Sequence, residues 1–165
     1  MNNFSILIKN GTIIDGTGKK RYLSNIIIDE DKIVSIYNSN QEAIVINNKK
    51  HLIKNLKFNK EIDAKSMVVA PGFIDVHTHD DQNIFDDPTM SCKISQGVTS
   101  CIVGNCGISL APFSYKGEVP APIALLGKSE VFRFPRVNDY KEEFNNKPSS
   151  VNLALLTGHS MLRVE

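Results

Sequence analysis

The sequence predicts an α/β protein in which a strand-rich N-terminal segment precedes a parallel α/β unit. Residues 1–46 contain short β-branched runs separated by turn residues, as expected of a small sheet. Residues 67–76 are almost continuously apolar, which is typical of a strand buried on both faces of a parallel sheet. Apolar strands are also expected at residues 98–105 and 151–157, and the polar or helical segments between them complete the rhythm of a parallel α/β fold.

Turn signals divide the N-terminal segment into strands of a small sheet or sandwich. Asn10-Gly11 predicts a hairpin between short strands on either side of it. The acidic stretch at residues 29–31 predicts a second turn, and residues 43–46 form a further β-branched run. We expect residues 47–60 to be a solvated, Lys- and Asn-rich surface insertion. A nucleic-acid patch is the alternative for these lysines, but Phe58 is the only aromatic residue among them.

The second segment begins at Met67 and contains helix signals between its strands. Asp87-Pro88 resembles an N-cap followed by proline at the first helical position, and Gly97 is placed to end that helix. A short helix is also expected around residues 139–144. These boundaries predict two parts, residues 1–66 and residues 67–165.

Composition limits the classes of partner. The chain has 165 residues, of which 41% are hydrophobic and 22% charged, and a net charge of +1. That balance indicates a globular protein without a nucleic-acid or membrane partner. No apolar run approaches the roughly 18 residues that span a membrane, and the N-terminus lacks a signal pattern. The cysteines, Cys92, Cys101 and Cys106, are odd in number and include no Cys-X-X-Cys, which indicates reduced thiols in the cytoplasm.

Metal-ligating residue types follow the expected strands. His77 and His79 share one face of an extended chain, about 7 Å apart along it, and can reach one metal ion. Cys106 and His159 follow the next two apolar strands. Because chemistry in parallel α/β folds lies at the carboxyl ends of the strands, we expect these four residues to converge on one rim. The alternatives are two exposed polar histidines, a buried structural cysteine and a His159 without a role.

Three acidic residues near the histidines are further candidates. Asp80 and Asp81 follow His79 directly, where they would orient a metal site or activate water. A solvated loop is an equal alternative for both carboxylates. Asp75 has the same strand parity as the two histidines, so it is a candidate to hydrogen-bond a ligand, or simply to stabilise the local structure.

These motifs resemble a known family. APGFIDVHTH, at residues 70–79, resembles the first-strand signature of the amidohydrolase superfamily. His79-Asp80-Asp81, VGNCGISLAP at residues 103–112 and GHSMLR at residues 158–163 resemble the N-acyl-D-amino-acid deacylases, or D-aminoacylases. IKNGTIIDG, at residues 8–16, resembles the β-sandwich strands of that family. The resemblance covers nearly the whole chain apart from residues 47–60.

The resemblance implies the start of a (β/α)8 barrel, with about three strands, preceded by part of a β-sandwich. It implies Zn²⁺ as cofactor and His77, His79 and Cys106 as metal ligands. His159, Asp75, Asp80 and Asp81 would contact the substrate or support the ligands. The reaction implied is hydrolysis of the amide bond of a small N-acylated D-amino acid, in which zinc activates water and polarises the acyl carbonyl.

The chain also departs from the family. The resemblance places two later histidine ligands and the catalytic aspartate beyond Glu165, so the barrel is expected to be incomplete. A (β/α)8 barrel takes about 250 residues. One interpretation is the N-terminal portion of a zinc-dependent deacylase, which would need a complementing chain that carries the rest of the barrel. The alternative is a catalytically inactive fragment. A metal-storage or redox protein is a third and weaker interpretation.

Overall fold

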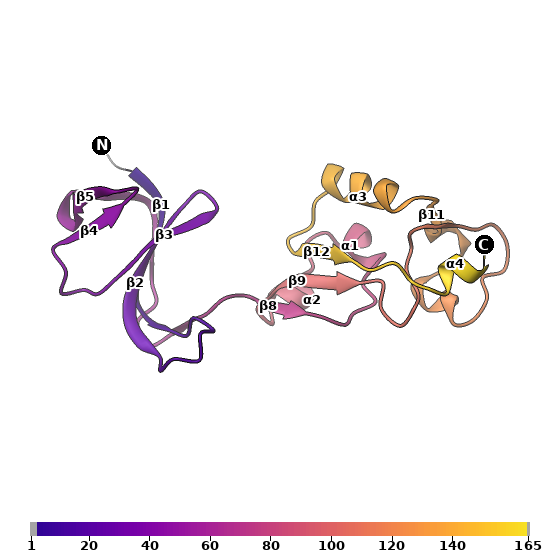
Figure 1. Ribbon diagram of the computed structural model, residues 1–165, viewed down its shortest axis with the longest axis horizontal. Helices are drawn as coiled ribbons and strands as arrows, with labels where there is room; N and C mark the ends of the chain where they lie inside the picture. Colours follow the sequence, from indigo (N-terminus) through magenta and orange to yellow (C-terminus); the bar gives the residue numbers. More distant parts are fainter. Residues whose placement is uncertain (1–2, 165) are drawn as a thin grey trace. The chain divides into compact units, whose positions relative to one another are not determined.

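The computed structural model describes residues 3–164, and they form two compact units. Unit 1 ends at Pro71 and unit 2 begins at Gly72. Unit 1 is built from strands, whereas unit 2 combines a parallel sheet with helices (Figure 1). Among the described residues, none of the helices combines the length and apolar character needed to cross a membrane.

Unit 1 contains a sheet with the strand order β3-β2-β1-β6, in which β7 also pairs with β1. β1 (Asn3–Ile13) is antiparallel to β2 (Tyr22–Asp29) and parallel to β6 (Lys57–Asp63) and β7 (Val68–Val69). β3 (Lys32–Tyr37) pairs with β2 across the expected acidic turn. The turn at residues 29–31 is therefore confirmed.

Asn10-Gly11 lies inside β1 and does not form the expected hairpin. The pairing of β1 with β2 shifts register between Ile8 and Gly11, which marks a β-bulge. Asn10 has a φ of 60°, its backbone N–H donates to Asn25 Oδ1 at 2.9 Å, and its side chain donates to Asp63. An asparagine with a left-handed backbone suits either a turn or a bulge, and its partners in β2 and at the end of β6 stabilise the bulge here.

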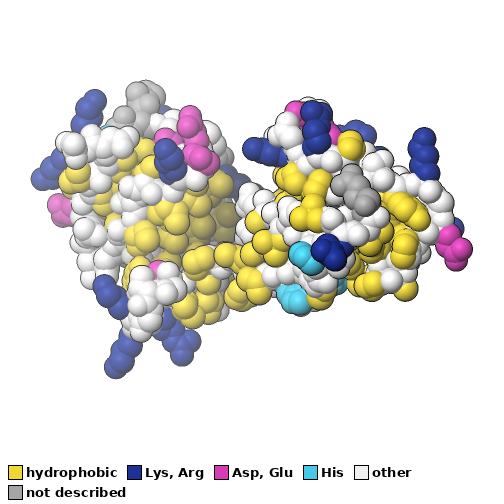
Figure 2. Space-filling model, turned by 45° about the vertical axis from the view of Figure 1, so that its right-hand side comes forward, with side chains coloured by type: hydrophobic (Ala, Val, Ile, Leu, Met, Phe, Trp, Pro, Cys, Tyr) yellow, Lys and Arg dark blue, Asp and Glu magenta, His cyan; other side chains and the backbone are white. Residues whose placement is uncertain are grey.

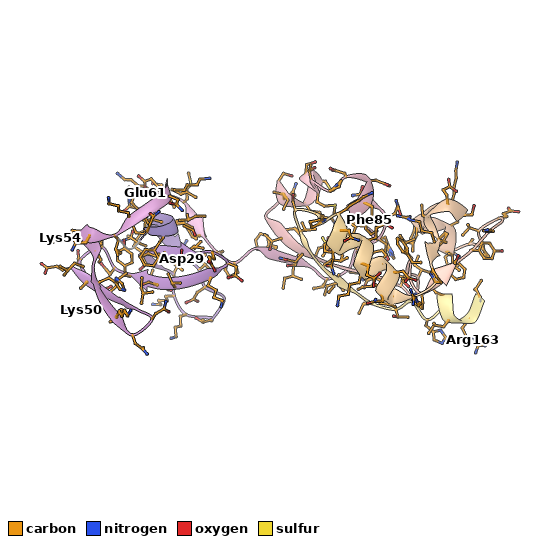
Figure 3. All side chains as sticks on the ribbon, turned by 90° about the horizontal axis from the view of Figure 1, so that it is seen from above. Asp29, Lys50, Lys54, Glu61, Phe85 and Arg163 are labelled. Carbon is orange, nitrogen blue, oxygen red and sulfur yellow. The ribbon has the colours of Figure 1, made fainter. Side chains whose placement is uncertain are left out.

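Residues 47–60, expected to be a solvated surface insertion, form regular secondary structure. β4 (Ala43–Ile46) and β5 (Lys49–Leu52) form an antiparallel hairpin, and β6 follows after a short 3-10 turn, η1 (Ile53–Asn55). Asn47 and Asn48 have φ values of 51° and 62°, which is the type I′ turn that two-residue hairpins prefer. Lys50 and Lys54 project from the edge of unit 1 (Figure 3). The lysines are therefore exposed residues of ordered elements.

Unit 2 is organised around the three-stranded parallel sheet β12-β9-β8. β9 (Val98–Val103) is the central strand, with β8 (Phe73–Asp75) on one side and β12 (Asn152–Leu155) on the other. α1 (Asn83–Asp86) and α2 (Ser91–Ile94) connect β8 to β9, and α3 (Val137–Asn146) precedes β12 (Figure 1). This order confirms the expected parallel arrangement of the three strands.

The connection from β9 to β12 contains short elements that help to form the core of unit 2. β10 (Phe113–Ser114) pairs with β11 (Arg133–Phe134), and between them lie η2 (Ile123–Leu126) and η3 (Ser129–Val131). α4 (Met161–Val164) follows β12. Phe113 packs edge-on against Phe132, and Phe134 packs edge-on against Tyr140 of α3. These contacts fix α3 and the β10-β11 ribbon on the same core.

Two local expectations for unit 2 are wrong. The chain from Met67 onward does not form one strand buried on both faces, because it is divided into β7 and β8 and β8 lies at a sheet edge. Ile74 and Val76 are 61% and 64% exposed. The helix expected after Asp87-Pro88 begins only at Ser91, because Asp87 instead accepts the backbone N–H of Thr89 and closes a turn.

Candidate metal centre

The segment that carries the two histidines follows β8 and has no regular secondary structure. His77 is exposed and His79 is partly buried. Their rings are adjacent, with centroids 5.9 Å apart and planes at 72°. Figure 2 shows histidine side chains at the surface of unit 2 beside hydrophobic groups. The two imidazoles are thus brought together by an irregular segment and not by the strand alternation expected from the sequence.

Cys106 lies in a tight turn directly after β9. Gly104, Cys106 and Gly107 have φ values of 82°, 55° and 76°, all in the left-handed region. A Cβ on Gly104 would lie 2.1 Å from the carbonyl oxygen of Leu156, so only glycine fits that close approach. The left-handed conformation costs a residue with a side chain about 1–2 kcal/mol. The surrounding turn compensates this cost and presents the Cys106 thiol.

Asn105 joins this turn to the histidine segment. Its side-chain amide donates to the carbonyl oxygen of Ile102 at 2.7 Å and to that of Thr78 at 3.3 Å. Thr78 lies between the two histidines and is itself buried. One amide group therefore connects the backbone that carries Cys106 with the backbone that carries His77 and His79.

His77, His79 and Cys106 form one cluster of ligand atoms. One atom from each side chain lies within 4.8 Å of the other two, and His77 Nε2 is 3.0 Å from Cys106 Sγ. Two ligands of one tetrahedral zinc ion lie about 3.5 Å apart, since metal–ligand distances are about 2.1–2.3 Å. His79 Nδ1 is also buried without a hydrogen-bond partner. The donor set of two imidazoles and one thiol, together with this spacing, fits a zinc ion.

Asp75 and Asp80 flank the two histidines and share a partner, Lys93 of α2. Lys93 Nζ lies 2.7 Å from Asp75 Oδ2 and 2.8 Å from Asp80 Oδ2. The hydrogen bond from Lys93 lowers the pKa of Asp75. Burial opposes the charge of Lys93, but hydrogen bonds to Asp75 and Asp80 raise the pKa of Lys93 above its usual value. Neither aspartate belongs to the ligand cluster, so both lie beside it.

Asp81 is not a solvated loop carboxylate. It is fully buried, and neither carboxylate oxygen has a hydrogen-bond partner at normal distance. Burial raises the pKa of Asp81 to about 6, and the backbone N–H of Gly104, the neighbouring His79 and the backbone N–H of Leu110 oppose this rise. The backbone oxygen of Asp81 accepts the hydroxyl of Tyr140 at 2.7 Å. A buried carboxyl group without a partner, next to a candidate ligand, is a feature that functional sites often contain.

His159 lies near the cysteine turn, but its side chain is not part of the ligand cluster. The N–H of Ser160 donates to the oxygen of Gly107 at 2.8 Å, and the N–H of Gly158 donates to Ser109 Oγ at 2.9 Å. The backbone around His159 is thus bound to the turn, while its imidazole is exposed. The three strand ends meet as expected, and three of the four expected side chains form the cluster.

Lys93 and Asn105 were not expected from the sequence. Lys93 resembles an ordinary charged residue on a helix, and no local pattern reveals that it contacts two aspartates about 15 residues away along the chain. Asn105 precedes the candidate ligand Cys106 directly, and this adjacency is the one signal that could have identified it.

The sequence and the fold are similar to those of known proteins. Residues 60–165 match the amidohydrolase family. A D-aminoacylase from Alcaligenes xylosoxydans xylosoxydans is 38% identical over 160 residues, which are 97% of this chain and 30% of that protein. The chain therefore spans about a third of the length of this relative.

Two solved structures extend the comparison. A D-aminoacylase studied for its binuclear metal centre is 39% identical, with a TM-score of 0.83, over 97% of this chain and 31% of that one. N-acyl-D-glutamate deacylase from Bordetella bronchiseptica, solved with zinc and a phosphonate that mimics the tetrahedral intermediate, is 34% identical. Its TM-score is also 0.83, and the match covers 98% of this chain and 31% of that one.

Proposed function

This chain belongs to the amidohydrolase family, and on that premise we propose that it carries part of the catalytic centre of a zinc-dependent hydrolase of N-acyl-D-amino acids. The observation that carries the proposal is the convergence of His77, His79 and Cys106 within 4.8 Å. Two similar proteins support it, since one contains a binuclear metal centre and the other was solved with zinc.

Each residue of the cluster has a distinct role in this proposal. His77 and His79 supply neutral imidazole nitrogens, and Cys106 supplies a thiolate. When bound, zinc polarises the acyl carbonyl and lowers the pKa of water, which prepares the amide for hydrolysis. Asp75 accepts the N–H of His77 at 3.3 Å and so fixes the backbone of that ligand. Asp81 is fully buried and close enough to His79 for their charges to interact.

We also propose the finer architecture. Residues 67–165 would supply the first three strands of a (β/α)8 barrel, and residues 1–66 would supply part of a β-sandwich. The consecutive parallel pairing of β8, β9 and β12 supports the first assignment, because barrel strands are neighbours in chain order. The three free cysteines are consistent with a reducing compartment, and we assign the protein to the cytoplasm on that ground.

A second candidate concerns the 165-residue chain by itself. It would be a catalytically inactive fragment, or one piece of an enzyme completed by another chain. The observation that favours it is the small number of ligand side chains in the described part of a chain that spans about 30% of the length of a similar D-aminoacylase. Within residues 3–164, the candidate centre contains three ligand side chains and no fourth.

Zinc content under reducing conditions tests the first proposal. We expect purified protein to retain zinc, and Cys106→Ala to lose it, because the substitution removes the only thiol of the cluster. Cys92→Ala is the matched control, since Cys92 is exposed and lies outside the cluster. Equal zinc content in all three proteins would contradict the assignment of Cys106.

Hydrolysis of N-acetyl-D-amino acids by the zinc-loaded chain separates the two candidates. Turnover that is specific for the D-enantiomer and lost in Cys106→Ala would exclude the inactive fragment. Zinc binding without turnover would support a partial centre. Turnover that appears only when a chain with the remaining barrel is added would identify a split enzyme.

A further inference from the structure

The histidine segment, residues 76–80, is held mainly by side chains. β8 ends at Asp75, so the strand ladder does not extend to either histidine. The described backbone contact of the segment to the sheet is one long hydrogen bond, from the N–H of Thr78 to the oxygen of Ile102 at 3.4 Å. Other groups must therefore hold the two imidazoles in place.

Lys93 supplies three such contacts from a single ammonium group. Its Nζ is 2.7 Å from Asp75 Oδ2, 2.8 Å from Asp80 Oδ2 and 3.1 Å from Thr78 Oγ1. Thr78 Oγ1 in turn donates to Asp80. Asp75 precedes His77, Thr78 separates the two histidines, and Asp80 follows His79. The three donors of one ammonium group thus contact the last residue of β8, which precedes the histidines, and two residues of the segment, one between the histidines and one after them.

The surroundings make these contacts strong. The Lys93 side chain is 19% exposed, and those of Asp75 and Asp80 are 28% and 17% exposed. Partly buried ion pairs are screened by salt much less than exposed ones. Lys93 is also fixed at its other end, because α2 connects directly to the central strand β9.

We propose that Lys93 is a positioning residue that holds His77 and His79 in the orientation in which they bind zinc. The inference rests on the proposed function, since it assigns Lys93 to that same centre. Lys93 is not one of the three side chains of the ligand cluster. It acts through Asp75, Thr78 and Asp80, in the way that groups behind metal ligands commonly set their orientation.

A purely electrostatic role predicts the opposite sign. Lys93 and the two aspartates together carry one net negative charge, so removal of the ammonium leaves two carboxylates and attracts a cation more strongly. If charge alone mattered, Lys93→Met would tighten zinc binding. If positioning dominates, Lys93→Met weakens zinc binding, because the segment loses its two contacts to Lys93 and the link through Lys93 to Asp75 of β8.

The test compares Lys93→Met and Lys93→Arg with the wild type, with Lys141→Met as the control because Lys141 is an exposed residue of α3. We expect Lys93→Met to weaken zinc binding about 10-fold or more in competition with a chromophoric chelator. We expect Lys93→Arg to restore most of the affinity and Lys141→Met to match the wild type. Unchanged or tighter zinc binding in Lys93→Met would overturn the inference.

A second measurement does not depend on metal. In chelator-treated protein, Lys93→Met should speed hydrogen exchange at the amides of His77 and Thr78, while the β9 amides keep their protection. Asp80→Asn, which removes one contact, should have a smaller effect in the same direction and replaces Lys93→Met if that variant does not fold. Unchanged exchange would overturn the inference. If wild-type protein binds no zinc, the proposed function fails, while the exchange comparison still decides the role of Lys93.

Discussion

The buried carboxyl group of Asp81 should make the stability of metal-free unit 2 depend on pH. Its pKa is about 6 in the folded chain, against an ordinary value of 3.8. Because the pKa of Asp81 is higher in the folded than in the unfolded chain, the neutral carboxyl group favours folding. This contribution to the free energy of unfolding is lost as the pH rises from about 4 through 6. A difference of about two pKa units corresponds to about 3 kcal/mol. About 2 kcal/mol of this should be lost between pH 4.5 and pH 7.

Asp81→Asn removes the titrating group and so tests this reasoning. The amide is also buried without a partner, so the absolute stability of the variant at one pH is not the informative quantity. The informative quantity is the change with pH: relative to wild type, Asp81→Asn should gain about 2 kcal/mol in free energy of unfolding between pH 4.5 and pH 7. Urea unfolding of chelator-treated protein at both pH values measures it.

The matched control is Asp86→Asn, because Asp86 lies five residues further along and is exposed. It should follow the wild-type pH dependence. If Asp81→Asn and wild type lose stability in parallel between pH 4.5 and pH 7, Asp81 is ionised in the folded chain. The backbone N–H groups of Gly104 and Leu110 would then compensate its burial more fully than the raised pKa implies, and the reasoning would be refuted.

Three further predictions concern the cysteine turn and its surroundings. Left-handed strain alone costs a residue with a side chain roughly 1–2 kcal/mol. Gly104→Ala should lower the free energy of unfolding by more than this, because the added Cβ would lie 2.1 Å from the Leu156 oxygen. Gly16→Ala is the control for thermal unfolding, since Gly16 has a similar φ and open space around it and should show the strain alone. Tyr140→Phe should cost about 1 kcal/mol by removing the hydrogen bond to the Asp81 oxygen, measured in urea, and should leave zinc affinity unchanged. In metal-free protein the exposed thiols of Cys92 and Cys106 should react quickly with a thiol reagent, and the buried thiol of Cys101 should react slowly. Zinc should protect one of the two fast thiols from the reagent. If zinc still protects a thiol in Cys106→Ala, Cys106 is not the ligand.

Much of the fold is predictable because its signals are local. The parallel order of β8, β9 and β12 follows from apolar runs separated by helical and polar segments, and the β2-β3 turn follows from its acidic residues. The bulge at Asn10 was not predictable, because the choice between a hairpin and a bulge depends on Asn25 and Asp63, which lie elsewhere in the chain. The β4-β5 hairpin was missed although Asn47-Asn48 is a type I′ turn signal.

The candidate site, like the fold, was predictable only in part. Its ligand types follow strand ends, so the convergence of His77, His79 and Cys106 could be predicted from topology. The environment of each carboxylate could not be predicted. Asp80 and Asp81 are adjacent, yet Asp80 pairs with Lys93 while Asp81 is buried without a side-chain partner among the described residues. Burial and ion pairing depend on segments that pack there from elsewhere in the chain, and the sequence around the motif does not contain that information.

The left-handed backbone at Cys106 also restricts which other ligands this position can carry. With a φ of 55°, the position accepts short polar side chains such as Asp and Asn more readily than β-branched ones. An aspartate there would keep the turn and exchange a soft sulfur ligand for a hard oxygen ligand. That exchange would shift metal preference from zinc towards ions such as Mn²⁺. In the proposed centre, the turn between Gly104 and Gly107 would therefore limit which metal ligands a single substitution at residue 106 can supply.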